Sequence, residues 1–133
     1  MDRYIVWKPF YSVGYTSLDD QHQQILEIIN DLYAAMERGD DRQVVPRLLD
    51  RLFEYTKTHF AFEERILREH GYPDLESHKK LHEAMRSKTA GLRSHVGLVL
   101  GPDLLRFLKD WWLGHIQEED QRYAPYVAAA VFR

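Results

Sequence analysis

Five of the seven histidines fall at positions that would share the apolar face of a helix: His22, His59, His78, His82 and His115. A single histidine in a protein core is normally satisfied by one carbonyl group. Five buried imidazoles cannot all find carbonyls inside helices whose carbonyls are already paired, and each unpaired imidazole costs desolvation energy. A metal cluster would satisfy all five together, so their placement favours a metal site.

The carboxylate of Glu63 is expected to enter the same interior. Glu63 follows His59 by four residues and His82 follows His78 by four, so each pair shares one face of a helix. An unpaired carboxylate in that interior would be costly, which strengthens the case for a metal. The neighbouring Glu64 points away from this face and is expected to be solvated.

A second carboxylate must come from the helix that carries His115. Regular helical spacing favours Glu119, four residues on, over Asp120, five residues on. Asp120 faces inward if the helix is locally widened, as a π-bulge would widen it. Unbroken α-helical hydrogen bonding from residue 111 to residue 123 would exclude that hypothesis.

The composition limits what kind of site this can be. The chain has 133 residues, no cysteine and a formal net charge of −3. Without cysteine there is no disulfide framework, zinc ribbon, thiolate-bound iron–sulfur cluster or cysteine nucleophile, so any metal must be bound by nitrogen and oxygen. The mild acidity argues against a nucleic-acid partner. No apolar run approaches the ~20 residues that cross a bilayer, and no secretory signal is evident, so we expect a cytoplasmic monomer.

Four helices are predicted to position these residues. Apolar residues recur at spacings of three, four and seven, and no sustained alternation of period two favours strands. We therefore predict an all-α fold, an antiparallel up-down-up-down four-helix bundle, in one domain over residues 1–133. The expected helices span about 18–38, 42–70, 74–95 and 103–123. An irregular N-terminal arm over residues 1–17 is expected to pack its aromatic side chains, which include Phe10, onto the core.

Turn signals set the expected ends of the helices. Ser17 and Asp20 resemble a capping box that opens the first helix, and Gly39 is expected to end it in a left-handed conformation. Pro46 lies early in the second segment, so either the helix begins there or its first turn is distorted. Pro125 is expected to end the fourth helix.

The ordered set of polar residues resembles that of the hemerythrins. Its seven members stand in the order and at the spacings of the ligands of that family's di-iron site: His22, His59, Glu63, His78, His82, His115 and Asp120. Trp7, the Val13-Gly14-Tyr15 run and the Tyr72-Pro73 pair are similar as well. The length and single-domain build are similar to the bacterial branch of the family, the bacteriohemerythrins.

This resemblance implies two iron ions that are held without haem. It assigns His78, His82 and His115 to one iron, and His22 and His59 to the other. It makes Glu63 and Asp120 ligands of both irons. A solvent-derived oxo or hydroxo bridge would complete six ligands on the first iron and five on the second. The open position implies reversible dioxygen binding, and hence an oxygen carrier, store or delivery protein rather than an enzyme.

Reversible oxygen binding needs a pocket that excludes water. Six apolar residues near the ligands are candidates to line that pocket: Trp112, Trp111, Ile25, Phe60, Ile66 and Met85. Each of them would fit an ordinary apolar core equally well. His70 and His95 lie near predicted helix ends, where exposure or a favourable interaction with the helix dipole is expected instead of metal binding.

Other classes of metalloprotein fit the sequence less well. A ferritin or a carboxylate-rich di-iron oxidase would need Glu-x-x-His pairs, and no glutamate here is followed by histidine at that spacing. A zinc protease would need His-Glu-x-x-His, whereas His78 is followed by Lys79. Alternatives that use the same di-iron site stay open: a redox enzyme acting on peroxide, nitrite or nitric oxide, an iron store, or an oxygen or redox sensor with a separate partner. Delivery to an oxygen-consuming enzyme would extend the carrier role.

Overall fold

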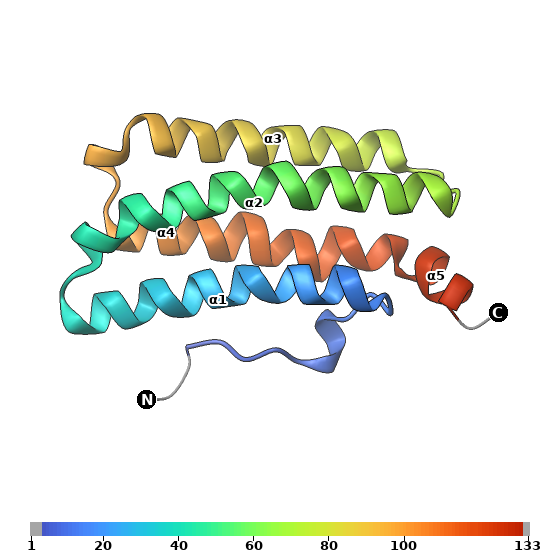
Figure 1. Ribbon diagram of the computed structural model, residues 1–133, viewed down its shortest axis with the longest axis horizontal. Helices are drawn as coiled ribbons and strands as arrows, with labels where there is room; N and C mark the ends of the chain where they lie inside the picture. Colours follow the sequence, from blue (N-terminus) through green and yellow to red (C-terminus); the bar gives the residue numbers. More distant parts are fainter. Residues whose placement is uncertain (1–3, 132–133) are drawn as a thin grey trace.

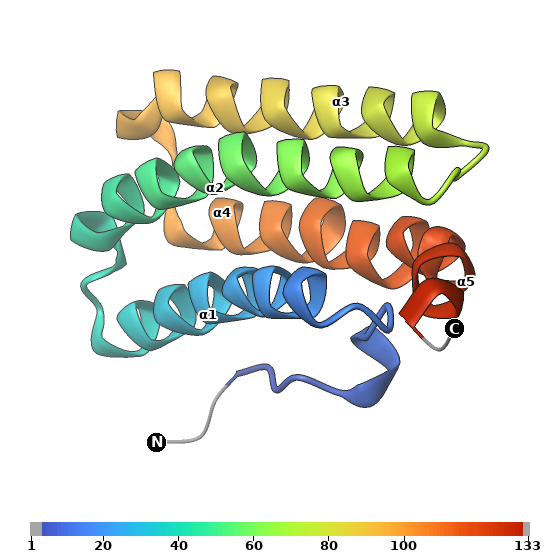
Figure 2. The ribbon, with the colours of Figure 1, turned by 45° about the vertical axis from the view of Figure 1, so that its right-hand side comes forward.

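Four long helices run side by side along one axis (Figures 1 and 2). The computed structural model describes residues 4–131, the last three of them by their backbone alone. The first three helices are α1 (Thr16–Arg38), α2 (Asp41–Glu69) and α3 (Leu75–Ser94). The fourth consists of α4 (Gly101–Phe107), η3 (Leu108–Leu113), η4 (His115–Glu119) and α5 (Asp120–Val131). Consecutive helices run in opposite directions, so the predicted up-down-up-down bundle is confirmed.

The first helix ends as predicted but begins differently. Gly39 adopts a left-handed conformation with φ of 76°, and its N–H donates to the carbonyls of the preceding turn. The predicted capping box at Ser17 is wrong, because α1 begins at Thr16, two residues before the predicted start, and its N-cap residue Tyr15 makes no side-chain capping hydrogen bond. The carboxylate of Asp19 instead accepts hydrogen bonds from the Ser12 hydroxyl at 2.5 Å and from the Val13 N–H at 2.8 Å. The first turn of α1 thus anchors the N-terminal arm.

Two prolines lie inside helices instead of at their ends. Helix α2 already begins at Asp41, so Pro46 stands in its second turn. The prediction that Pro125 ends the fourth helix is wrong, because α5 continues through it to Val131. A proline removes one backbone hydrogen bond and crowds the preceding turn, which bends a helix without necessarily ending it. Figure 2 shows α5 turned out of line with the segments before it.

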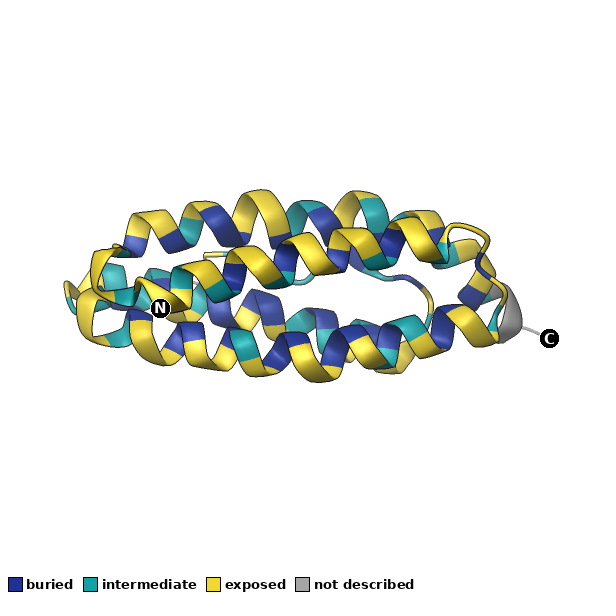
Figure 3. Cartoon of the chain, turned by 90° about the horizontal axis from the view of Figure 1, so that it is seen from above, coloured by how far each residue is buried: buried dark blue, intermediate teal, exposed yellow. Residues whose placement is uncertain are grey.

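The inward faces of the helices form two apolar clusters. The larger one includes Ile25 of α1, Phe60 of α2 and Met85 of α3, together with Trp112 of η3. The smaller one is formed by these residues: Val13, Leu18, Ile66, Leu67, Tyr72, Tyr123 and Val127. The buried positions follow the inner side of each helix in Figure 3. Within residues 4–131, no helix combines the length and the apolar character that a membrane span requires.

The N-terminal arm lies along α1 (Figure 1) and includes a short 3-10 turn, η1 (Pro9–Tyr11). The Asn30 amide fixes it, because Asn30 Oδ1 accepts from the Ile5 N–H at 2.9 Å and Asn30 Nδ2 donates to the Ile5 carbonyl at 2.8 Å. Tyr11 is buried as expected, but Phe10 is 64% exposed, so the prediction that the arm packs its aromatic residues onto the core fails for Phe10. Residues 1–3 of the predicted arm lie outside the described part of the chain.

Candidate metal centre

The fourth helix is locally widened beside His115. Segments η3 and η4 are π-helical, so the backbone accommodates an extra residue per turn there. His115 and Asp120 are consequently both buried, although five residues separate them. Glu119 is half-buried and pairs with Arg122 at 3.7 Å instead. The π-bulge hypothesis is thereby confirmed, and Asp120 is the inward-facing carboxylate.

One oxygen of each buried carboxylate lies near two members of a group of three histidines, His78, His82 and His115. Oε1 of Glu63 lies 2.7 Å from His78 Nε2 and 3.0 Å from His82 Nε2. Oδ1 of Asp120 lies 3.1 Å from His78 Nε2 and 3.0 Å from His115 Nε2. These nitrogens and oxygens therefore converge on one point between α2, α3 and the fourth helix.

The other oxygen of Glu63 lies near both remaining histidines, and the other oxygen of Asp120 lies near one of them. Oε2 of Glu63 lies 3.1 Å from His22 Nε2 and 3.2 Å from His59 Nε2. Oδ2 of Asp120 lies 3.1 Å from His22 Nε2. The two carboxylates thus stand between a three-histidine group, His78, His82 and His115, and a two-histidine group, His22 and His59. The structure brings all seven predicted ligand residues together.

These atoms fit metal ligands better than hydrogen-bonding partners. Among the described residues, His82 Nε2, His115 Nε2 and both carboxylate oxygens of Asp120 have no hydrogen bond, although each lies about 3 Å from a nitrogen or oxygen of another residue of the cluster. Neighbouring ligands of one ion are about 3 Å apart when metal–ligand bonds are about 2.1 Å long. Imidazole and carboxylate are ligands that suit iron, whereas thiolate is absent. The donor set therefore fits a pair of iron ions, one in each group.

The two buried carboxylates require positive charge at this position. Burial alone would raise the pKa of Glu63, but His59 and hydrogen bonds from the surrounding imidazoles hold it well below its usual value. Burial and the charge of Glu63 raise the pKa of Asp120, yet His115 and His22 hold it well below its usual value too. Both carboxyl groups are therefore ionised. Burial lowers the pKa of His22, but the attraction of Asp120 raises it to about 10.

Comparison with known proteins agrees with this geometry. A family model described as the hemerythrin HHE cation binding domain matches residues 13–127. The chain belongs to the hemerythrin family. It is 35% identical over 127 residues to a bacteriohemerythrin of Stenotrophomonas maltophilia, covering 94% of this chain and 82% of that protein. It is 33% identical over 118 residues to a myohemerythrin of Sipunculus nudus, covering 89% of both chains.

The fold is also that of solved hemerythrins. A crystal structure of wild-type hemerythrin superimposes with a TM-score of 0.80 at 29% sequence identity, covering 94% of this chain and 98% of that chain. The resemblance inferred from the order and spacing of seven residues is therefore confirmed over most of the chain. Membership of the hemerythrin family also agrees with a cation site at the centre of the bundle.

Two histidines of the cluster are held by side chains that were not predicted to contact them. His82 Nδ1 donates to Glu64 Oε2 at 2.8 Å, and His59 Nδ1 donates to Gln21 Oε1 at 2.6 Å. The prediction that Glu64 is solvated is wrong, because its long side chain reaches across to α3 and is half-buried there. Burial raises the pKa of Glu64, but the hydrogen bond from His82 lowers it overall.

Two tyrosines complete the surroundings of the hemerythrin cluster. Tyr123 OH donates to Glu63 Oε2 at 2.9 Å. Tyr55 stacks on the His59 imidazole with ring centres 4.9 Å apart, and its OH donates to the Gln21 carbonyl at 2.7 Å. Tyr123 follows Asp120 by three residues, and that spacing could have placed it on the same face.

Four of the six residues proposed to line an oxygen pocket lie in the larger apolar cluster: Trp112, Phe60, Ile25 and Met85. Phe60 is stacked between His82, at 3.8 Å, and Trp112, at 5.3 Å between ring centres. The other two lie elsewhere in the structure. Trp111 is 42% exposed, because the widened η3 turns it outward, and Ile66 lies one turn beyond Glu63 in the smaller cluster.

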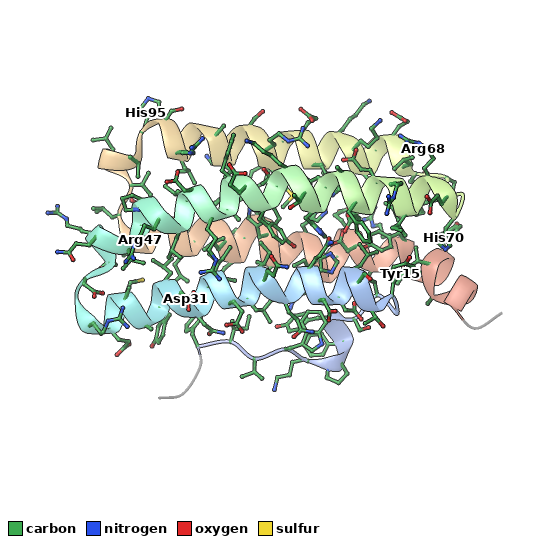
Figure 4. The ribbon with its side chains drawn as sticks, viewed as in Figure 1. Tyr15, Asp31, Arg47, Arg68, His70 and His95 are labelled. Carbon is green, nitrogen blue, oxygen red and sulfur yellow. The ribbon has the colours of Figure 1, made fainter. Side chains whose placement is uncertain are left out.

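The remaining two histidines lie far from the cluster, at opposite ends of the bundle (Figure 4). His70 Nδ1 donates to the Ile66 carbonyl at 2.8 Å, and His95 Nδ1 donates to the Gly91 carbonyl at 3.1 Å. Each imidazole thus satisfies a carbonyl in the last turn of its own helix, as predicted.

Proposed function

We propose that this hemerythrin binds dioxygen reversibly at a non-haem di-iron centre, as an oxygen carrier, store or delivery protein. The observation that carries the proposal is that the five imidazoles divide into a group of three and a group of two on either side of the two carboxylates. Family membership and the bacteriohemerythrin and myohemerythrin relatives support it.

The protein ligands differ in number at the two positions. The three-histidine group offers three nitrogens and two carboxylate oxygens, whereas the two-histidine group offers two nitrogens and two oxygens. A solvent-derived bridge would raise these counts to six and five, which would leave one position for dioxygen beside His22 and His59. When bound, the two irons would supply the electrons that dioxygen accepts reversibly.

The chain itself would provide a dry and ordered surrounding. Phe60 and Trp112 are both fully buried and stack on each other beside the imidazoles, so they keep water from the centre. Tyr123 holds its proton toward Glu63 Oε2 and favours the ionised carboxylate. Tyr55 OH already donates to the Gln21 carbonyl, whereas the buried Trp112 Nε1 has no acceptor among the described residues.

Visible absorption spectroscopy tests the proposal. The iron-loaded protein, reduced without oxygen and then exposed to air, should develop a ligand-to-iron charge-transfer band that disappears when oxygen is removed. Two irons per chain should be found by metal analysis. Irreversible bleaching, or steady oxygen consumption with added reductant, would instead support a redox enzyme.

A further inference from the structure

A surface groove separates α3 from the fourth helix. One part is a cavity of about 190 Å³ bounded by these residues: Leu81, Met85, Asp110, Trp111, Gly114, His115, Glu118 and Glu119. An adjoining cavity of about 220 Å³ shares Leu81 and Glu119 with it and reaches His78 and Arg122. We call the two together the His115 groove.

This groove leads from the protein surface to the three-histidine group. His115 and His78 both line it, whereas His22 and His59 line neither part. His115 is 7% exposed, and none of the other four cluster histidines exceeds 3%. The imidazole edge of His115 is therefore the most direct contact between solvent and the candidate metal centre.

The rim of the groove around Trp111 is apolar and acidic, and the basic Arg122 of the adjoining part is paired with Glu119 at 3.7 Å. Trp111 is 42% exposed and Leu81 is 37% exposed, although both are large apolar residues. Asp110 and Glu118 are also exposed, and neither has an ion pair within the described part of the chain. Exposed aromatic residues mark protein interfaces, and unpaired negative charge steers a positively charged partner toward them.

We propose that the His115 groove is the docking site of an electron-donor protein with a basic face, which restores the ferrous form. This inference rests on the proposed di-iron function. In each encounter the donor would lose one electron, which an iron ion held by His78, His82 and His115 would gain through the His115 imidazole. A second encounter supplies the second electron, and no covalent bond forms or breaks in either transfer.

The surroundings of the two groups favour this side for electron entry. On the two-histidine side, Tyr55 stacks on His59 and meets the buried Trp112 edge to face, so a protein donor cannot reach the His59 imidazole through these rings. The three-histidine group has its full set of ligands in the proposed centre, so an electron can arrive there without displacing one. Interfaces for electron transfer are commonly small, which suits a groove of this size.

Reduction kinetics test the charge of the groove. The oxidised, iron-loaded protein is mixed with hexaammineruthenium(II), a cationic one-electron donor, at several ionic strengths. Asp110→Asn with Glu118→Gln should slow reduction about tenfold at low salt and flatten its salt dependence. The control pair Glu54→Gln and Glu69→Gln removes the same charge from α2, outside the groove, and should leave the rate unchanged. Equal rates for both pairs would overturn the proposal.

A binding measurement tests the docking itself and requires no oxygen chemistry. The zinc-loaded protein, which is diamagnetic, is titrated with a lysine-rich c-type cytochrome as a basic electron carrier and followed by nuclear magnetic resonance. Shifts should concentrate at Trp111 and Leu81, and Trp111→Ala should weaken binding at least fivefold while leaving the oxygen spectrum of the iron form unchanged. Shifts confined to another face would overturn the inference even if oxygen binding is reversible. Shifts at the groove without reversible oxygen binding would refute only the proposed function.

Discussion

His82 is held between two carboxylates, with Nδ1 donating to Glu64 Oε2 at 2.8 Å and Nε2 lying 3.0 Å from Glu63 Oε1. The Nδ1 hydrogen bond fixes the orientation of the ring and leaves Nε2 as the atom that faces the candidate metal. A carboxylate acceptor also makes the imidazole a stronger donor toward a cation than a neutral acceptor would. Glu64 therefore contributes to the three-histidine group without belonging to it.

Glu64→Gln should weaken metal binding at the three-histidine position. Glutamine keeps the shape and the hydrogen bond but removes the negative charge, and changes of this kind typically cost about 10- to 100-fold in metal affinity. Competition with a chelator measures the effect. Glu76→Gln, on an exposed face of α3, is the control and should retain the original affinity. If the Glu64→Gln variant kept the original metal affinity, the negative charge of Glu64 would have no effect on metal binding.

His59→Ala should empty the two-histidine position first. That group has the smaller number of protein ligands, and His59 supplies one of its two nitrogens. Metal analysis should find iron falling from two toward one per chain, whereas His95→Ala should keep both. Loss of both irons in equal measure would contradict independent loading of the two positions.

Tyr123→Phe should destabilise the bundle by about 2 kcal/mol, the usual value of a buried hydrogen bond to a charged group. The change removes the proton that Tyr123 OH donates to Glu63 Oε2 and leaves the ring in place. Denaturant titration of the iron-loaded protein measures the loss. Tyr126→Phe is the matched control, because the Tyr126 side chain is 42% exposed. Similar midpoints for the two variants would argue against the role assigned to Tyr123.

Removal of metal should lower the melting temperature clearly, because two buried carboxylates and five imidazoles then lose their shared cations. Differential scanning calorimetry of metal-free and iron-loaded protein at one pH measures the difference. Equal melting temperatures would contradict the coupling of metal binding to folding.

The metal-free protein should also lose stability as the pH rises from about 7 to 10. Despite burial, the carboxylates raise the pKa values of His22 and His78 to about 10, above the unfolded value of 6.5. Groups whose pKa is raised on folding stabilise the folded state fully below 6.5 and lose that contribution as the pH approaches 10. The iron-loaded protein should be nearly insensitive over this range, because its bound imidazoles carry no extra proton. Parallel pH profiles for the two forms would refute this assignment.

The sequence predicts the cluster well where helices are regular. His59 with Glu63 and His78 with His82 stand four residues apart, so periodicity alone places each pair on an inner face. Asp120 was predictable only with a π-bulge, since nothing local distinguishes it from Glu119. The hydrogen-bond pattern that decides between them depends on packing of the whole fourth helix.

The predictions that differ from the structure concern residues whose position depends on side-chain length or on local backbone geometry. Glu64 has the correct helical direction for solvent, but its side chain is long enough to reach His82 on a neighbouring helix. Trp111 was expected inside because regular α-helical spacing relates it to His115, and the widened turn changes that relation. Pro125 interrupts hydrogen bonding without ending the helix, because α5 still packs through Tyr123 and Val127.

The widened segment makes the spacing between paired ligands differ from one helix to another. In α2 and α3 the second ligand of each pair follows the first by four positions, whereas in the fourth helix Asp120 follows His115 by five. The extra residue turns every later position by one step, so the orientation of Tyr123 toward Glu63 is set by the same local change. The inward position of Asp120, and with it the second carboxylate of the centre, thus depends on the hydrogen-bond register of a single helix.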